Sequence, residues 1–381
     1  MSRIVIHKVN SPDDARAFHL VPWTIYRTDP VWVPPPVPEI EGIFDPQNNA
    51  FFRKGDAVRF LATRDGKYIG RIAAMVNTEK DYQSSPALGG FGFFESVDDQ
   101  EVAFNLLDHA REWLSSRNLD GMRGPINFGE NDRWWGLLIE NFHESPSYGM
   151  PYNPRYYKRL FTEYGLEKHH DQLSYKLSLD TGIPERLAKI GDRALSRDAV
   201  RVKMADLSNL EREAQDIRTI YNRAWEEMDI ENFFDNFTPL TEETVNQMIR
   251  ELKPVLVPEG IWMAYVQDQP ASFILTIPDI NQALRHLNGK MHPLNMLRFM
   301  VYRNKITRLR VLAFGTIKRY RRMGLEAAVF SKGMRYLNKT NSRYREVIGA
   351  WTGEENWLMQ RSIEGAGGEL YQKHRTYVKL F

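Results

Sequence analysis

The chain has no cysteine among its 381 residues. This absence excludes disulfides, a catalytic thiolate and cysteine-ligated metal sites, and we expect no bound metal. The chain also lacks an excess of one charge, since 51 basic residues stand against 49 acidic ones. This balance argues against a general nucleic-acid binder and restricts electrostatic binding to local clusters.

Long apolar runs are missing as well. No stretch approaches the ~20 uninterrupted apolar residues that span a bilayer. The first eight residues alternate like an edge strand and contain no signal-peptide core. We therefore expect a cytoplasmic protein. Its length and its 42% of hydrophobic residues are sufficient for two packed domains.

The most informative segment is a basic turn at residues 318–329, with the sequence KRYRRMGLEAAV. Four basic side chains precede Gly324, and an apolar helix is expected to follow it. A helix N-terminus offers free backbone N–H groups and the positive end of the helix dipole, and glycine lets a pyrophosphate approach the backbone. The segment therefore favours binding of a nucleotide-containing cofactor.

This turn resembles the acyl-CoA loop of the GNAT superfamily of N-acyltransferases. Arg321 and Gly324 match the family pattern, whereas Glu326 stands where the family has a small residue. The preceding residues 311–314 are similar to the family's fourth strand, whose exposed backbone edge pairs with the pantetheine amides. The resemblance implies acyl-CoA as a co-substrate bound by Val311, Leu312, Ala313, Arg319, Arg321, Arg322, Gly324 and Leu325.

The resemblance extends over roughly the last 180 residues, far more than one loop. The helix is followed by a short apolar strand at 346–351, by Asn356 opening another helix, and by a closing strand at 375–380. This is the order found in the family. One position departs from it: the family often has a tyrosine seven residues after the asparagine, as general acid toward the thiolate, and here Ile363 stands there.

The first half of the chain looks like a distant copy of the second. A predicted hairpin at 60–73 repeats at 262–274 with an offset of 202. Asn153 and Gly165 match Asn356 and Gly368 with an offset of 203. A predicted helix at 102–114 aligns with the one after Gly324 at an offset of 223. The jump implies about 20 extra residues before this helix in the second half, and a similar insertion after it in the first.

The alignment places carboxylates in the first half where the second half has its basic turn. Asp98, Asp99 and Glu101 correspond to Arg321, Arg322 and Gly324. Because like charges repel, we expect the first half not to bind acyl-CoA and its acids to cap a helix instead. The sequence thus predicts an α+β protein of two GNAT-like domains, each a mixed, mostly antiparallel twisted sheet flanked by helices. We expect a degenerate domain at 1–180, a linker helix at 181–198 and a GNAT domain with the acyl-CoA loop at 199–381.

Two insertions are candidates for binding an acceptor substrate. Glycines, polar residues and tryptophans on one loop are typical of a binding pocket, and equally of a structured inter-domain loop. The first insertion supplies the candidate substrate-binding residues Asn127, Asn131, Asp132, Trp134 and Trp135.

The second insertion, at 292–303, predicts a helix with Leu294, Leu297, Met300 and Val301 on one face and Arg298 and Arg303 elsewhere. Such a stripe is most often part of a core. Otherwise it covers a long acyl chain or makes a peripheral contact with an anionic membrane.

The resemblance implies direct transfer, in which a neutral amine attacks the thioester carbonyl and a base removes the proton. By position, Glu355 and Asn356 are the candidate catalytic residues, with Glu354 beside them. Glu130 or Asp132 of the first half are alternative bases, although solvated loop acids are the commoner interpretation of each acid. The predicted function is acyl-CoA-dependent N-acylation of a small-molecule or lipid-like amine. Some bacterial tandem GNAT-like proteins look like enzymes that acylate long-chain amines, including sphingoid bases.

Two alternatives stay open. One is a Fem-type aminoacyl transferase that uses aminoacyl-tRNA, and the other is a noncatalytic protein that binds CoA or another ligand. The sequence does not indicate the acceptor or the oligomeric state.

Overall fold

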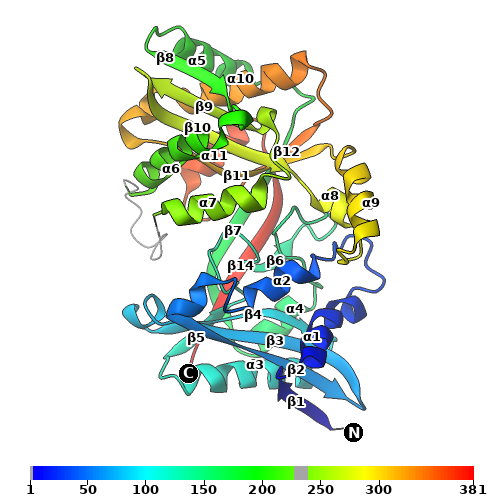
Figure 1. The fold of residues 1–381 in the computed structure, drawn as a ribbon. Coiled ribbons are helices and arrows are strands. Elements are labelled where there is room, and N and C mark those ends of the chain that lie inside the picture. Colours follow the sequence, from blue (N-terminus) through cyan, green and yellow to red (C-terminus); the bar gives the residue numbers. More distant parts are fainter. Residues whose placement is uncertain (1–2, 227–238) are drawn as a thin grey trace. The chain divides into compact units, whose positions relative to one another are not determined.

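The computed structural model describes residues 3–226 and 239–381 (Figure 1). Their contacts form two compact units. The first unit comprises Met1–Leu173, Ala283–Met300 and Gln372–Phe381, and the second comprises Ser174–Gln282 and Val301–Tyr371. This division differs from the expected halves, because residues 181–198 group with the second unit while two distant segments return to the first.

The first unit is a sheet with helices on both faces (Figure 1). Its strands run in the order β1-β2-β3-β4-β5-β14, antiparallel except for the parallel pair β4–β5. Its elements are β1 (Ile4–Lys8), α1 (Pro12–Ile25), α2 (Val37–Ile43), β2 (Gly55–Arg64), β3 (Lys67–Asn77), β4 (Leu88–Ser96), α3 (Gln100–Ser115), β5 (Gly121–Gly124), β6 (Leu137–Glu140) and α4 (Tyr157–Glu163), with 3₁₀ turns at Ala50–Lys54 and Asp81–Gln83.

Alternation along the strands explains how both faces of this sheet are covered. Phe60, Ala62 and Ile72 pack with α3 and α4 in one core cluster. Leu61 and Ala73, which point the other way because side chains alternate along a strand, pack with α1 and α2. The stripe expected at 102–114 is the buried face of α3.

The second unit repeats this arrangement. Its strand order is β8-β9-β10-β11-β12-β7, and again only one pair, β11–β12, is parallel. Its elements are α5 (Glu185–Leu195), β8 (Val200–Met204), α6 (Leu210–Glu226), α7 (Glu242–Leu252), β9 (Ile261–Val266), β10 (Gln269–Pro278), β11 (Arg308–Thr316), α10 (Leu325–Lys339), β12 (Glu346–Ile348), β13 (Thr352–Gly353) and α11 (Trp357–Gly365), with 3₁₀ turns at Leu207–Asn209, Pro258–Gly260 and Lys318–Met323.

Four elements contribute residues to both units: β7 (Glu167–Ser178), β14 (Glu369–Leu380), α8 (Asn281–Leu284) and α9 (Pro293–Arg303). The end of β7 pairs with β12 in the second unit, at Ser178 with Glu346. The end of β14 pairs with β5 in the first unit, at Leu380 with Gly121. Each sheet is therefore completed by a strand from the other half of the sequence.

The matching order of elements confirms the fold class and the internal repeat. In both units a hairpin turns on two successive residues with positive φ, Asp65–Gly66 and Gln267–Asp268, as a type I′ turn requires. β10 ends at Pro278 and β11 begins at Arg308, whereas β3 ends at Asn77 and β4 begins at Leu88. The longer connection holds α8 and α9, so the insertion expected there is confirmed.

Two details of the expected repeat are wrong. The equivalent glycines with positive φ are Gly165 and Gly367. Each precedes a residue whose N–H closes the helix end with a 6→1 bond. These bonds join Leu166 N to Phe161 O (3.0 Å) and Gly368 N to Ile363 O (2.9 Å). The glycine expected to match, Gly368, is one residue further on. The strand expected at 346–351 ends at Ile348, because the chain then leaves β11 and the Gly349 N–H bonds Tyr175 O at 2.8 Å.

His374 is a buried, neutral histidine on β14, with a ring nitrogen 3.0 Å from the Pro151 carbonyl oxygen. Burial lowers the pKa of its imidazole to about 4, below the 6.5 of an exposed histidine. As the pH falls, His374 is therefore protonated in the unfolded chain before it is protonated in the folded protein. The contribution of His374 to the free energy of unfolding is therefore fully present above pH 6.5. It is expected to fall by about 3 kcal/mol as the pH drops toward 4.

Urea unfolding at pH 7.5 and pH 5 measures this effect. His374→Gln should reduce the loss of stability between the two pH values, whereas the exposed control His143→Gln should leave it unchanged. An equal pH dependence in the His374 variant would refute a buried neutral imidazole.

Candidate functional site

The acyl-CoA site expected in the second unit begins at the edge of β11. Val311, Leu312 and Ala313 lie in the middle of this strand, whose other edge pairs with β10. The parallel pairing with β12 covers only Arg308, Leu309 and Arg310. Among the described residues, no strand pairs with β11 on this side beyond Arg310. The two strands separate there and leave a backbone edge with peptide groups available to a ligand.

At the carboxyl end of β11 the basic turn has the predicted form. A 3₁₀ turn over Lys318–Met323 leads to Gly324, which has φ 76° and occupies the N-cap of α10. Only glycine adopts such a φ without strain. Gly324 has no side chain to cap the helix, and no side chain of the described residues caps it either. First N–H groups of this kind, with the positive end of the helix dipole, can bind an anion. Leu325, expected to bind cofactor, is buried in the core cluster beneath this turn.

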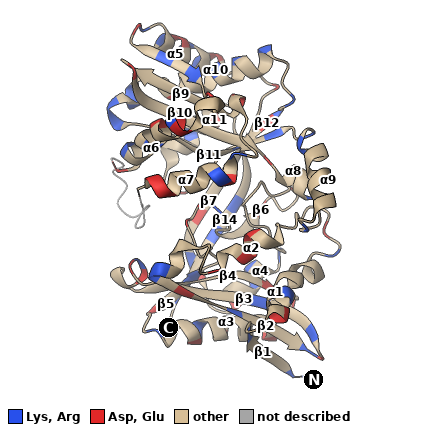
Figure 2. Cartoon of the chain, in the orientation of Figure 1, with Lys and Arg blue, Asp and Glu red and all other residues tan. Residues whose placement is uncertain are grey.

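The basic side chains of the turn have different roles. Arg321 donates from Nη2 to the Ala224 carbonyl oxygen (2.9 Å) and from Nε to Thr316 O (3.3 Å), so it holds the turn against α6. Arg319 and Arg322 are exposed. Figure 2 shows basic and acidic residues interspersed along most of the chain. Glu326 is an exposed acid in the first turn of α10, a departure from the family that weakens the positive potential there.

Helix α5 packs against the basic turn and supports it. The sequence predicted a helix here but not this contact. Arg197 donates to the Met323 carbonyl oxygen at 2.9 Å. A Cβ at Gly324 would come within 2.8 Å of Ile190 Cγ2, and Asp192 accepts two bonds from Arg335. Two small residues, Gly191 and Ala194, lie three positions apart on one face of α5 and allow this close packing against α10. Their spacing is the sequence feature that could have indicated it.

In the first unit, the chain itself occupies the equivalent edge of β4. Ile126 N donates to Phe91 O at 2.8 Å, and a Cβ at Gly92 would lie 1.8 Å from the Ile126 carbonyl oxygen. The glycines of β4 therefore allow this close approach. Asn127, a candidate substrate-binding residue, lies in this same segment.

Of the three acids expected to cap the helix, only Asp99 is confirmed as the N-cap of α3, and Glu101 lies inside its first turn. Asp99 is the N-cap and accepts a bond from Val102 N at 3.2 Å, and it also pairs with Arg64 at 2.8 Å. Asp98 forms an ion pair with Arg159. The cap and the occupied edge together give the first unit a structural reason not to bind a CoA molecule as the second unit would.

The remaining candidate substrate-binding residues lie in the loop before β6. Trp134 and Trp135 pack against the core cluster that includes Phe18 and Ile126, and Trp134 has φ 53°. Asn131 is half-buried and Asp132 is exposed. These positions resemble a structured loop more than an open pocket, and their role in binding stays a prediction.

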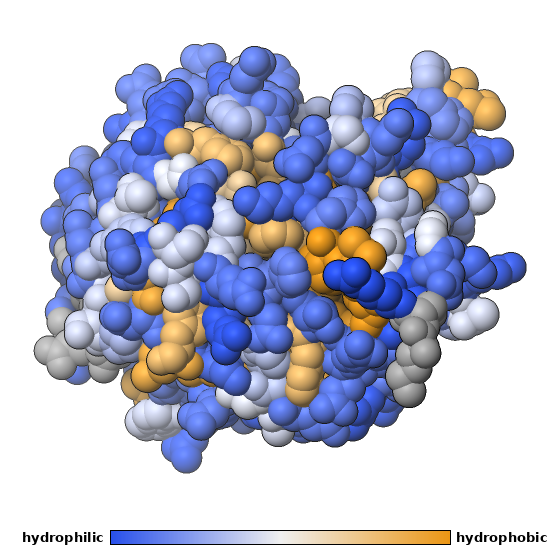
Figure 3. Space-filling view, turned by 90° about the horizontal axis from the view of Figure 1, so that it is seen from below, coloured by the Kyte–Doolittle hydropathy of each residue, from blue (hydrophilic) through white to orange (hydrophobic). Residues whose placement is uncertain are grey.

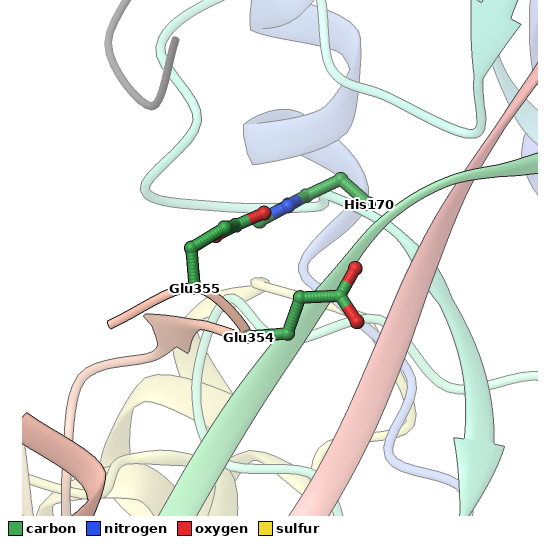
Figure 4. Close-up of side chains that lie close together, drawn as sticks. All are labelled: His170, Glu354 and Glu355. Atoms are coloured by element: carbon green, nitrogen blue, oxygen red, sulfur yellow. The ribbon is translucent and has the colours of Figure 1, made fainter. Parts of the chain in front are cut away.

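The candidate catalytic residues follow β13 in the second unit. Asn356 is the N-cap of α11, where its side chain accepts a bond from Met359 N at 3.2 Å, so it has a structural role whatever its chemistry. Glu355 precedes it and is exposed, and Glu354 is half-buried. Figure 4 shows both glutamates leaving this turn, together with His170 on β7, a residue of the first unit.

Tyr175 supplies a hydroxyl next to the position where Ile363 replaces the tyrosine of the family. Its hydroxyl lies 3.2 Å from Glu364 Oε1, on the residue after Ile363. Burial, followed by the charge of Glu364, raises the pKa of Tyr175 to about 12. This phenol therefore keeps its proton at neutral pH.

Comparisons with known proteins agree with this geometry. The chain is 30% identical to the bacterial ceramide synthase of Caulobacter vibrioides over 383 residues, which cover 97% of this chain and 96% of that protein. It is 26% identical to protein YghO of Escherichia coli, over 96% of this chain and 93% of that protein. No protein-family model matches the chain.

Two solved structures share the fold. One is a tandem GNAT protein from the clavulanic acid biosynthesis pathway, with a TM-score of 0.57, 10% identity, and coverage of 99% of this chain and 98% of that one. The other contains the GCN5-related glucosamine N-acetyltransferase region of a fungal multi-domain protein, with a TM-score of 0.58, 13% identity, and coverage of 100% and 38%.

Proposed function

We propose that the chain, which belongs to the family of the bacterial ceramide synthase and has a tandem GNAT fold, is an acyltransferase for lipid-like amines. It would transfer an acyl group from acyl-CoA to the amine of a long-chain base. The open edge of β11 beside the uncapped N-terminus of α10 is the observation that carries the proposal. The name of the relative supports the acceptor class, because a ceramide is an N-acylated sphingoid base.

Two parts of acyl-CoA, the pantetheine and the pyrophosphate, would find partners in the second unit. The peptide groups of β11 after Arg310 would pair with the pantetheine amides, as an added strand does. The first N–H groups of α10, with Arg319 and Arg322, would hold the pyrophosphate. Arg321 would position the turn through its bonds to the backbone rather than through the ligand.

The reaction follows from this placement. A neutral amine attacks the thioester carbonyl, the new C–N bond forms, and the C–S bond breaks from a tetrahedral intermediate whose oxygen β11 N–H groups would stabilise. Glu355 is the candidate base for the ammonium proton. The leaving thiolate needs a proton that Ile363 cannot give, and Tyr175 is our candidate donor. Asn356 would act by fixing the start of α11.

Thiol release from a series of acyl-CoAs, with sphinganine as the amine, tests this function. We expect an amide product, and affinity that rises from acetyl-CoA to palmitoyl-CoA below the micelle concentration. Burial of the acyl chain by the protein would contribute about 0.8 kcal/mol per methylene, so a long chain would then bind tighter by orders of magnitude.

Other outcomes would point to other functions. A flat series would mean that the acyl chain stays in solvent and would favour a short-acyl enzyme. Binding of CoA without amine-dependent thiol release would favour a noncatalytic protein. Amide formation from aminoacyl-tRNA, with release of free tRNA and no thiol, would favour the Fem-type alternative.

A further inference from the structure

Helix α9 carries an exposed apolar face, which corrects the interpretation of its stripe as core. Hydrophilic residues dominate the face drawn in Figure 3, with apolar residues gathered in a few places. Contiguous exposed apolar side chains usually mark an interaction site. On α9 they are Leu294 (56% exposed), Leu297 (67%), Met300 (52%) and Val301 (57%), with Met296 (40%) beside them.

The buried face of α9 lies on the opposite side of the helix. Asn295 is buried and donates to the carbonyl oxygens of Leu287 (2.9 Å) and Lys290 (2.8 Å), and Phe299 is also buried. At about 100° per residue, both side chains lie about 160° from Leu297 around the helix axis. The helix is therefore held to the protein by one face and presents apolar side chains on the other.

Basic residues border the apolar face on both sides. By the same geometry Arg298 and Arg303 lie about 100° and 120° from Leu297, in opposite directions. No acidic residue occurs in the sequence between Asp279 and Glu326. Two further basic residues, Lys290 and Lys305, lie near the ends of α9. A surface that pairs with α9 should therefore be apolar within and anionic at its boundary.

We propose that α9 docks on the surface of an anionic phospholipid bilayer, lying in the plane of the interface. Its apolar face would enter the acyl region, while Arg298, which is exposed, would reach the phosphates, as long basic side chains do at interfaces. Eleven residues are too few to cross a bilayer, and none of the described helices is both long and apolar enough to do so. A bilayer matches this pattern of charge better than a second protein surface, which would need acids at both borders.

Co-sedimentation of the full chain with sucrose-loaded vesicles tests the proposal. We expect binding to phosphatidylcholine vesicles that contain phosphatidylglycerol, and weaker binding without it. Leu294→Ser combined with Leu297→Ser should reduce binding at least tenfold on both. Arg298→Gln should reduce it only on the anionic vesicles. The matched control is Val5→Ser, an exposed valine (49%) on β1, which should bind as the wild type does.

Two measurements keep the result unambiguous. Far-ultraviolet circular dichroism and the melting temperature should be the same for all variants, because the altered side chains are exposed. Light scattering tests the alternative occupant, a second copy of the chain. Equal vesicle binding by the serine variant and the wild type would overturn the proposal. It would also be overturned if the wild type is a dimer and the serine variant a monomer that still binds vesicles.

Discussion

Calorimetric titration of CoA into the full chain is expected to give one site, and Arg322→Glu should weaken that site by at least 100-fold. In the described part of the second unit, no strand pairs with β11 beyond Arg310 on this edge and no side chain caps α10, whereas Ile126 occupies the equivalent edge in the first unit. A glutamate facing the pyrophosphate replaces attraction by repulsion, and a 100-fold change corresponds to about 2.8 kcal/mol.

The choice of variant matters for this test. Arg321→Glu should also abolish binding, but it removes the bonds to Ala224 and Thr316 that hold the turn, so loss of binding there does not separate contact from folding. Arg322 is exposed, and Arg212→Glu on the exposed side of α6 is a matched charge reversal that should leave affinity unchanged. Asp98→Ala should do the same. Two equivalent sites would overturn the assignment of the first unit as degenerate.

The fragment 199–381 is expected not to fold, although it contains the whole acyl-CoA turn. It lacks the end of β7 that pairs with β12, and it lacks α5, whose Ala194 belongs to the core with Leu325. It also loses the Arg197 bond to Met323 at the turn. An unpaired sheet edge and an uncovered helix face both favour aggregation.

Fragment 174–381 is the informative control, because it restores β7 residues 176–178 and α5. We expect it to be more soluble than 199–381 and to melt more cooperatively, as measured by circular dichroism and size-exclusion chromatography. Full CoA affinity and a cooperative melt in 199–381 would show that β7 and α5 are dispensable.

Much of the second unit could be predicted because its signals are local. Positive φ in a two-residue hairpin, a glycine at the start of α10 and an asparagine at the start of α11 follow from preferences of single residues. The acids before α3 were predicted to be caps for the same reason, and Asp99 is one.

The sequence by itself determined the tandem repeat, the α+β class and the position of the basic turn, since periodicity and turn chemistry act over a few residues. Only the tertiary structure decided three other features. These are the strand exchange of β7 and β14, the filling of the β4 edge by Ile126, and the exposure of the α9 stripe. The physical reason is that an apolar or extended segment has the same local pattern whichever partner it meets. Burial and strand pairing depend on residues far away in the sequence, so the pattern alone could not choose between them.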